Sequence, residues 1–169
     1  MFEIGERIIY GSEGVFTVLE YSSSPVDKND DRTFYVLRSS FGGESSIIYT
    51  PVDNSKVTMR RIMTREQALS LVERIPSILP LTVEIEKQRR DIYRDVIAHA
   101  DADGYVSLIK TVYERREQYA RQKKRVSDTD ADYEKKAKYC LYGELASALE
   151  LQISEVERFI GERISALEE

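Results

Sequence analysis

The sequence contains no tryptophan, one cysteine and one histidine. Because Cys140 has no second cysteine to pair with, no internal disulfide can form, and we expect a reducing compartment. No apolar run approaches the roughly 18 residues that span a bilayer. The first residues also lack the basic start and apolar stretch of a secretory signal. These absences together predict a cytoplasmic protein outside the membrane.

The same scarcity of histidine and cysteine excludes most catalytic and metal sites. His99 lies between Ala98 and Ala100 with no cysteine nearby, so we expect no metal site. No serine is surrounded by a nucleophile-elbow motif, and no glycine-rich phosphate loop is present. Cys140 is flanked by Tyr139 and Leu141, which is typical of a buried, unreactive thiol. We therefore expect no enzymatic activity, no cofactor and no small-molecule substrate.

Charge is distributed unevenly along the chain. The 169 residues carry 25 basic and 30 acidic side chains, a net charge of −5 at pH 7, which argues against nonspecific nucleic-acid binding by the molecule as a whole. Residues 87–125 nevertheless hold 11 basic and 6 acidic side chains, a local net charge of +5. Two interpretations are open for this segment: solvated helix faces, or a surface that binds phosphates.

Basic residues near the ends of the expected helices are the candidate phosphate contacts. They are Lys87, Arg89, Arg90, Arg94, Arg115, Arg116, Arg121, Lys123, Lys124, Arg125, Lys135, Lys136 and Lys138. The acidic neighbours Asp91, Asp95 and Glu117 weaken the local field. Binding to DNA should therefore be weak and strongly dependent on salt, and a second contact would be needed to hold the protein in place.

The hydrophobic pattern changes period once along the chain. Five short runs rich in β-branched and aromatic residues predict strands over residues 2–10, 14–21, 33–39, 45–50 and 57–62. The turn Phe41-Gly42-Gly43 separates the third run from the fourth. Strands of this number and spacing are typical of a small barrel or sandwich.

From Thr64 onward the period is helical. A capping box at Thr64–Gln67 opens a first helix, and further helices are expected over residues 81–100, from 105, from about 130, and from a second capping box that begins at Ser154. Strands followed by helices indicate an α+β chain with two domains. We place a β-barrel domain at residues 1–62 and an all-α helical bundle at residues 64–169.

Several motifs resemble the CarD/CdnL family of bacterial transcription regulators. They are Phe2–Tyr10 with Gly14-Val15, Phe34–Leu37, Tyr49–Asn54, Lys136-Ala137-Lys138 and Leu141–Ala146, and they extend over nearly the whole chain. The resemblance implies a Tudor-like or SH3-like barrel that binds the β subunit of RNA polymerase. It also implies a helical domain that contacts promoter DNA at the upstream edge of the transcription bubble and so affects the lifetime of the open complex.

By the same resemblance, the polymerase contact would use Ile47, Ile48, Tyr49 and Pro51. Addition of a partner strand to an exposed edge is a known mode of recognition. The alternative is that these residues belong to the barrel core, and alternation requires either Ile47 or Ile48 to point inward. Some members of the family have an arginine at the position of Tyr49.

The chain departs from the family at one position of interest. Well-known members have a tryptophan at the start of the DNA-contacting helix, where it wedges into the bubble edge, and Ile85 is nearest that position. An aliphatic wedge can insert at a base step but lacks the stacking area of an indole. Ile85 is alternatively a core residue of the helix expected over residues 81–100.

The main rival function is a protein-interaction module that never touches DNA.

Overall fold

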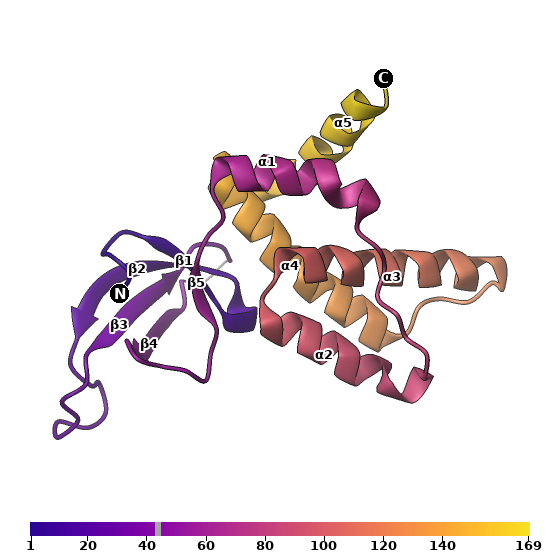
Figure 1. Cartoon of the computed structure of the whole chain (residues 1–169). Coiled ribbons are helices and arrows are strands. Elements are labelled where there is room, and N and C mark those ends of the chain that lie inside the picture. The colour runs from indigo at the N-terminus through magenta and orange to yellow at the C-terminus, as the bar shows by residue number, and fades with distance from the viewer. Residues whose placement is uncertain (43–44) are drawn as a thin grey trace.

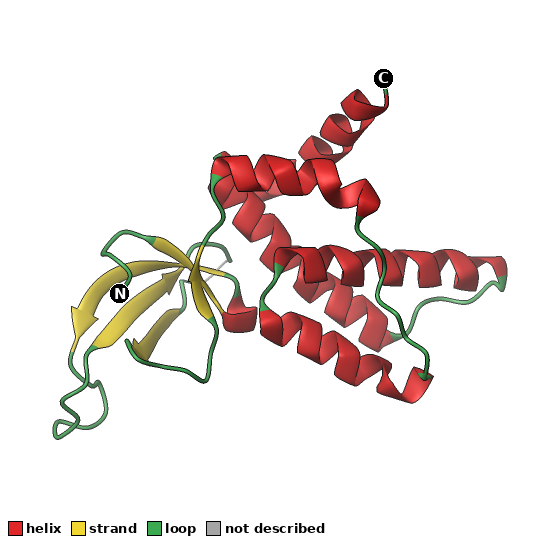
Figure 2. Ribbon diagram, viewed as in Figure 1, coloured by secondary structure: helices red, strands yellow, loops and turns green. Residues whose placement is uncertain are grey.

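The computed structural model describes residues 1–42 and 45–169. It is an α+β structure in which strands and helices are segregated along the chain and in space (Figures 1 and 2). The strands are β1 Arg7–Tyr10, β2 Val15–Ser22, β3 Phe34–Ser39, β4 Ile47–Pro51 and β5 Met59–Arg61. The helices are α1 Arg65–Arg74, α2 Arg89–His99, α3 Ala102–Arg121, α4 Asp128–Leu149 and α5 Val156–Glu168.

The strands form one open antiparallel sheet in the spatial order β4-β3-β2-β1-β5. The five expected strands are all present, although the first begins at Arg7 rather than at residue 2. Gly43 of the expected turn lies outside the described residues. Among those described, no helix is both long and apolar enough to cross a membrane.

Both faces of the sheet bury apolar side chains. One face carries a cluster made of Ile8, Phe16, Val18, Tyr35 and Leu37. On the opposite face, Ile9 and Val15 pack with Ala100, which ends α2. Neighbouring residues of a strand point to opposite faces, which is why Ile8 and Ile9 belong to different clusters. The second face therefore attaches the sheet to the helices.

The helices bury a larger core, and their starts follow the local sequence. Thr64 caps α1 as expected: its hydroxyl accepts from the Gln67 amide at 3.2 Å, and the Gln67 side chain accepts from the Thr64 amide at 2.8 Å. The expected capping box at Ser154 is wrong. The capping box begins two residues earlier, where the Gln152 amide donates to the Glu155 carboxylate at 2.9 Å.

The helix expected to begin at Leu81 is shorter than predicted. Residues 81–85 belong to no helix or strand, with an extended backbone at Ile85, a short 3₁₀ turn covers Glu86–Gln88, and α2 begins at Arg89. β-Branched residues lower helix propensity here. The Leu81 amide is also used elsewhere, since it donates to the Thr111 hydroxyl of α3 at 2.8 Å. This segment therefore crosses α3 as an extended strap.

Polar side chains at the junction join the sheet to the helices. The fully buried Glu144 of α4 accepts from both terminal nitrogens of Arg60 in β5, at 2.6 and 2.8 Å. It also accepts from the Met63 amide at 2.9 Å. Arg60 in turn donates to the carbonyl of Ala100 at 2.8 and 3.1 Å. One ion pair thus connects β5, the segment leading to α1, the end of α2, and α4.

Candidate functional site

The first predicted surface lies on edge strand β4. β4 is at the end of the sheet and pairs only with β3 among the described strands. Ile47 and Tyr49 point outward and are 45% and 47% exposed, whereas Ile48 points inward against the sheet's core cluster. The alternation leaves one apolar pair facing solvent beside unpaired backbone groups. Such an edge is a template for a partner strand.

A fixed turn follows this strand. Pro51 is half-buried, and its carbonyl accepts from the Asn54 amide at 3.0 Å. The Asn54 side chain donates to the hydroxyl of buried Thr50 at 2.8 Å. Because Asn54 bonds to both Pro51 and Thr50, the end of β4 is held in one conformation. The family-like Pro-Val-Asp-Asn sequence thus shapes the edge rather than adding a chemical group to it.

The second predicted surface lies at the end of the helices farthest from the sheet. Ile85 is 53% exposed immediately before α2, so the prediction that it is a core residue is wrong. Its position on the extended strap, outside the helix, explains the exposure. Lys87 and Arg90 follow it in the sequence and are exposed.

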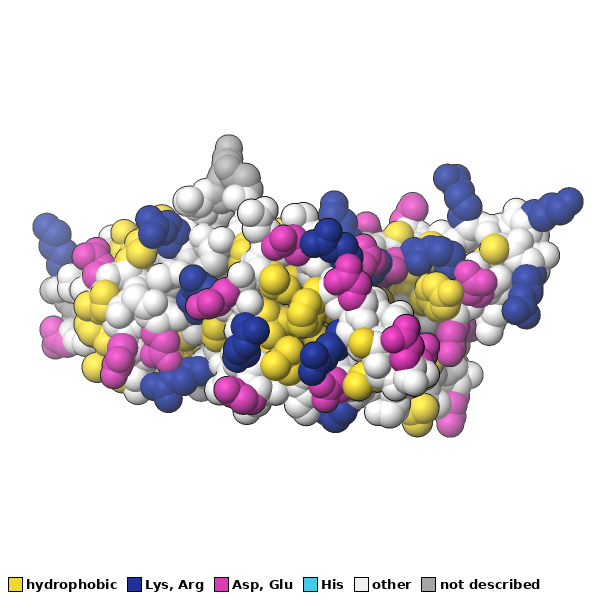
Figure 3. All heavy atoms as spheres, turned by 90° about the horizontal axis from the view of Figure 1, so that it is seen from above, with side chains coloured by type: hydrophobic (Ala, Val, Ile, Leu, Met, Phe, Trp, Pro, Cys, Tyr) yellow, Lys and Arg dark blue, Asp and Glu magenta, His cyan; other side chains and the backbone are white. Residues whose placement is uncertain are grey.

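The segment between α3 and α4 adds further cations to this end. Arg121, Lys123, Lys124 and Arg125 are exposed, and the Lys124 amide closes the end of α3 by donating to the Tyr119 carbonyl at 2.8 Å. Seen from above, Lys and Arg side chains project from the end of the molecule opposite the sheet (Figure 3). We call residues 85, 87, 90, 121 and 123–125 the basic tip.

Two of the predicted phosphate contacts are instead engaged inside the helical part. Arg89 and Arg115 have side chains that are only 17% and 14% exposed, and both contact Asp130, which is fully buried. The Nε atoms of Arg89 and Arg115 lie 3.2 and 3.4 Å from its carboxylate oxygens. The Tyr93 hydroxyl donates to the same carboxylate at 2.9 Å. This cluster locks α2, α3 and α4 together just behind the basic tip.

Glu86 extends the cluster to the surface. It accepts from Arg115 at 2.8 Å and from Arg89 at 2.5 Å. The hydrogen bond from Arg115 lowers the pKa of Glu86, and the same bond raises the pKa of Arg115. Burial and the hydrogen bond to Asp130 raise the pKa of Tyr93, so this phenol stays protonated at neutral pH. Arg89 and Arg115 therefore hold the helices behind the basic tip together and add little free charge to it.

Three other predicted cations are paired with acidic neighbours. Arg116 and Lys138 contact Glu134 at 2.5 and 3.2 Å. Exposed Arg94 lies 3.2 Å from Asp91. The pairing reduces the charge that these side chains can offer to a phosphate.

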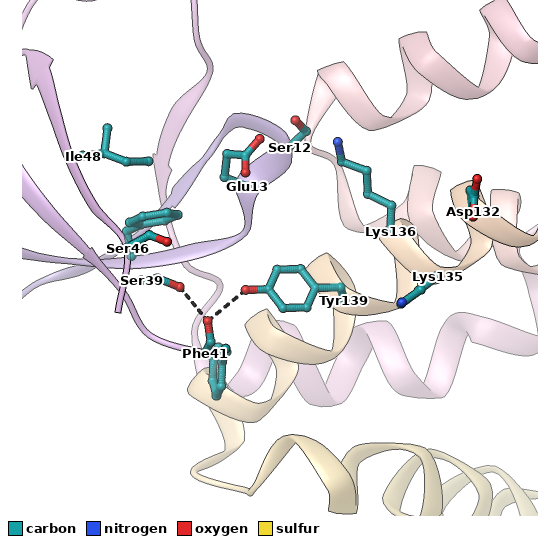
Figure 4. Close-up of a pocket in the computed structure, with 12 residues that line it drawn as sticks. Ser12, Glu13, Ser39, Phe41, Ser46, Ile48, Asp132, Lys135, Lys136 and Tyr139 are labelled. Carbon is teal, nitrogen blue, oxygen red and sulfur yellow. Dashed lines mark hydrogen bonds between the residues drawn. The ribbon is translucent and has the colours of Figure 1, made fainter. Parts of the chain in front are cut away.

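Lys135 and Lys136 lie apart from the basic tip, on a hollow of about 580 Å³ between α4 and the sheet. In Figure 4 the Lys136 side chain extends toward the turn that carries Ser12 and Glu13. Tyr139 forms part of the wall and donates to the Phe41 carbonyl at 3.0 Å. It is 38% exposed. The structure thus does not bring all predicted cations to one surface.

Cys140 and His99, the remaining residue types that often carry catalysis or bind metals, make local contacts with the backbone. Cys140 is buried, its thiol donates to the Ser12 carbonyl at 3.4 Å, and burial raises the thiol pKa. A ring nitrogen of His99 contacts the Asp95 carbonyl at 2.9 Å. Over residues 1–42 and 45–169, no group of three His, Cys, Asp or Glu side chains is placed to hold a metal ion.

Sequence reasoning missed the junction pair Arg60–Glu144 and the buried acid Asp130. The available signal was the position of Glu144 within the apolar run Leu141–Ala146. A carboxylate in such a run must find a cation or lose its charge.

The chain matches no protein-family model and no curated protein.

Proposed function

We propose that this protein is a bacterial transcription regulator of the CarD/CdnL kind, without catalytic activity, that acts in the cytoplasm. In this proposal residues 1–62 form a small Tudor-like or SH3-like barrel that binds the β subunit of RNA polymerase. Residues 64–169 form a helical domain that contacts promoter DNA at the upstream edge of the bubble. The two contacts together alter the stability of the open complex.

The observation that carries the proposal is edge strand β4. An unpaired edge that presents Ile47 and Tyr49 to solvent fits a partner that adds a strand and buries two apolar side chains. Ile48 and Pro51 then have supporting roles, the first in the sheet core and the second in the turn. The absence of an arginine at position 49 makes this contact more apolar than in members that have one.

The basic tip supports the DNA half of the proposal. Exposed Lys87 lies in the 3₁₀ turn that follows Ile85, and exposed Arg90 lies in the first turn of α2, so phosphate contacts and an apolar wedge are adjacent. Such a pairing suits a bubble edge, where a side chain inserts at an opened base step while cations hold the backbone. The net charge of −5 limits free DNA binding, so polymerase would deliver the tip to its site.

A pull-down with the isolated polymerase β subunit tests the proposed contact between edge strand β4 and polymerase. We expect the full chain to bind at low salt, and Ile47→Lys together with Tyr49→Lys to abolish binding. Tyr113→Lys is the matched control, because Tyr113 is a 59% exposed tyrosine on α3, away from the edge. No association of the unmodified chain would overturn the proposal.

The rival function is a docking module that binds polymerase or another partner without touching DNA. The ion pairs of Arg94, Arg116 and Lys138 favour it, because they leave fewer cations for phosphates. A gel shift with forked promoter DNA, with and without polymerase, separates the two. A shift that needs polymerase but does not change when the basic tip is neutralised would favour the docking module.

A further inference from the structure

A second hollow, of about 600 Å³, lies between the sheet and the C-terminal end of α4. Its sheet side includes Arg7, Thr17 and Arg38, and its helix side includes Ser147 and Glu150. We call it the arginine pocket. Along α4, Ser147 is about 25 Å from Asp130 and hence from the basic tip, at 1.5 Å per residue. The arginine pocket is therefore a separate feature from the proposed DNA surface.

The two arginines stand in one row across three strands. Arg7 of β1 lies opposite Thr17 of β2, and Thr17 lies opposite Arg38 of β3. Directly opposed residues point to the same face of a sheet, and adjacent strands are about 4.8 Å apart. The two guanidinium groups therefore emerge on one face with a hydroxyl-bearing residue between them.

Neither arginine is neutralised within the part of the chain that the structure describes. No carboxylate of residues 1–42 or 45–169 forms an ion pair with Arg7 or Arg38. Arg7 makes only a long contact, 3.5 Å, to the Ser147 carbonyl. Glu150 also lines this hollow but forms no ion pair with either arginine, so the two cations indicate a site for an anion.

Ser147 provides independent support for a ligand. The residue is only 7% exposed, and its hydroxyl has no hydrogen-bond partner among the described residues. Leaving a buried hydroxyl unsatisfied is unfavourable, so such groups call for a specific explanation. The hydroxyls of Thr17 and Ser40, 3.1 Å apart, lie on the same pocket and add further donors.

The shape and charge of the pocket define its ligand. A guanidinium donates two parallel hydrogen bonds to phosphate oxygens, so two guanidiniums offer more donors than one phosphate needs and can engage both phosphates of a diphosphate. Glu150 on the rim and the carbonyl end of α4 oppose anion binding, so the two guanidiniums have to outweigh this repulsion. We propose that the arginine pocket binds a small diphosphate, either inorganic pyrophosphate or the diphosphate group of a nucleotide.

Calorimetric titration of the full chain tests this site, with sodium pyrophosphate and adenosine diphosphate as probes in magnesium-free buffer. We expect saturable binding of at least one probe at one site per chain. Arg7→Gln and Arg38→Gln should each weaken it about tenfold, as loss of a charged hydrogen-bonding group does. Ser147→Ala should weaken it severalfold without lowering the thermal stability of the ligand-free protein.

Matched controls separate the pocket from general attraction to cations. Arg158→Gln removes one exposed arginine from α5, and Lys124→Gln removes one cation from the basic tip. Both should leave the affinity unchanged. Tighter binding of adenosine diphosphate would identify a nucleotide ligand, and equal binding would identify the diphosphate alone.

Two results would overturn the assignment of the arginine pocket. One is no binding of either probe at 10 mM, about the weak limit of a specific small-ligand site. The other is binding that the double variant Arg7→Gln, Arg38→Gln retains in full while Lys124→Gln weakens it. The proposed polymerase contact is measured separately by pull-down, so failure of either proposal leaves the other intact.

Discussion

The carboxylate of Glu144 in α4 accepts two hydrogen bonds from the guanidinium of Arg60 in β5, at 2.6 and 2.8 Å. Glu144 is fully buried, while the Arg60 side chain is 32% exposed. These residues are 84 positions apart in the sequence, and their contact fixes the sheet against the helices. The edge of β4 and the basic tip are thereby held at one relative orientation.

Breaking this pair should destabilise the whole chain. Glu144→Gln keeps the size of the side chain but leaves the Arg60 charge without its partner. We expect a loss of about 2–3 kcal/mol in the free energy of unfolding, discounted from the 3–5 kcal/mol of a fully buried pair because Arg60 is partly exposed. Urea denaturation followed by circular dichroism measures it.

The control for Glu144→Gln is Glu117→Gln, which removes an exposed carboxylate of α3 that has no ion pair among the described residues. It should change the unfolding free energy by less than about 0.5 kcal/mol. Equal effects of the two variants would contradict a special role for the junction pair.

The basic residues of α2 and α3 should divide into two classes. Arg115→Gln should cost about 3 kcal/mol of stability, because Asp130 would lose a partner while it stays fully buried. Arg90→Gln should leave stability unchanged and instead reduce the salt slope of forked-DNA binding by about 0.9, the value for one lost phosphate contact. Thermal unfolding and fluorescence anisotropy at several salt concentrations measure the two effects.

Arg121→Gln is the control for both the stability and the DNA-binding measurements, since Arg121 lies on the same helix as Arg115 and is exposed. It should behave like Arg90→Gln. If Arg115→Gln weakens DNA binding with no loss of stability, Arg115 is a direct phosphate contact and our division of the residues is wrong.

Ile85 should contribute to DNA binding and not to folding. Its side chain is 53% exposed, so Ile85→Ala should change the unfolding free energy by less than about 0.5 kcal/mol. Loss of an inserted wedge should weaken binding to forked DNA about fivefold, corresponding to about 1 kcal/mol of apolar contact. Ile85→Trp should strengthen binding, because an indole stacks on the opened base step.

Leu79→Ala is the matched control for Ile85→Ala. Leu79 is another exposed aliphatic residue, 78% exposed, just before the extended strap. It should leave DNA binding unchanged. Equal losses for the two variants would show that Ile85 has no special contact with DNA.

Stability should fall in acid partly because of Glu134. Burial alone would raise the pKa of Glu134, but the hydrogen bonds and charges of Arg116 and Lys138 lower it on balance below its ordinary value of 4.5. A carboxyl group whose pKa is lower in the folded state stabilises that state above the unfolded pKa. This contribution is then lost as the pH falls through the folded value.

Thermal unfolding between pH 7 and pH 3 measures this contribution. The melting temperature of the unmodified chain should fall more steeply below about pH 4.5 than that of Glu134→Gln, which has no proton to bind at this position. At pH 7 the variant should be the less stable of the two. Parallel pH profiles would contradict the assigned role of Glu134.

The sequence by itself determined the local features of this protein. The β-branched and aromatic residues of the run 2–10 predicted a strand, and the Thr64–Gln67 box predicted the start of a helix, because both depend on neighbours a few positions away. The sequence likewise predicted that Cys140 would be buried, from its apolar flanks. The start of α2 was not predictable, because the Leu81 amide is bonded to Thr111 of another helix.

Only the tertiary structure decided which charged residues face solvent. Arg89 and Arg90 are adjacent in the sequence, yet one contacts buried Asp130 and the other is exposed. The reason is geometric: consecutive residues of a helix point about 100° apart, and Asp130, the partner of Arg89, lies 41 positions later on another helix. Whether a cation is a structural partner or a free charge therefore depends on contacts between distant segments, which no local pattern encodes.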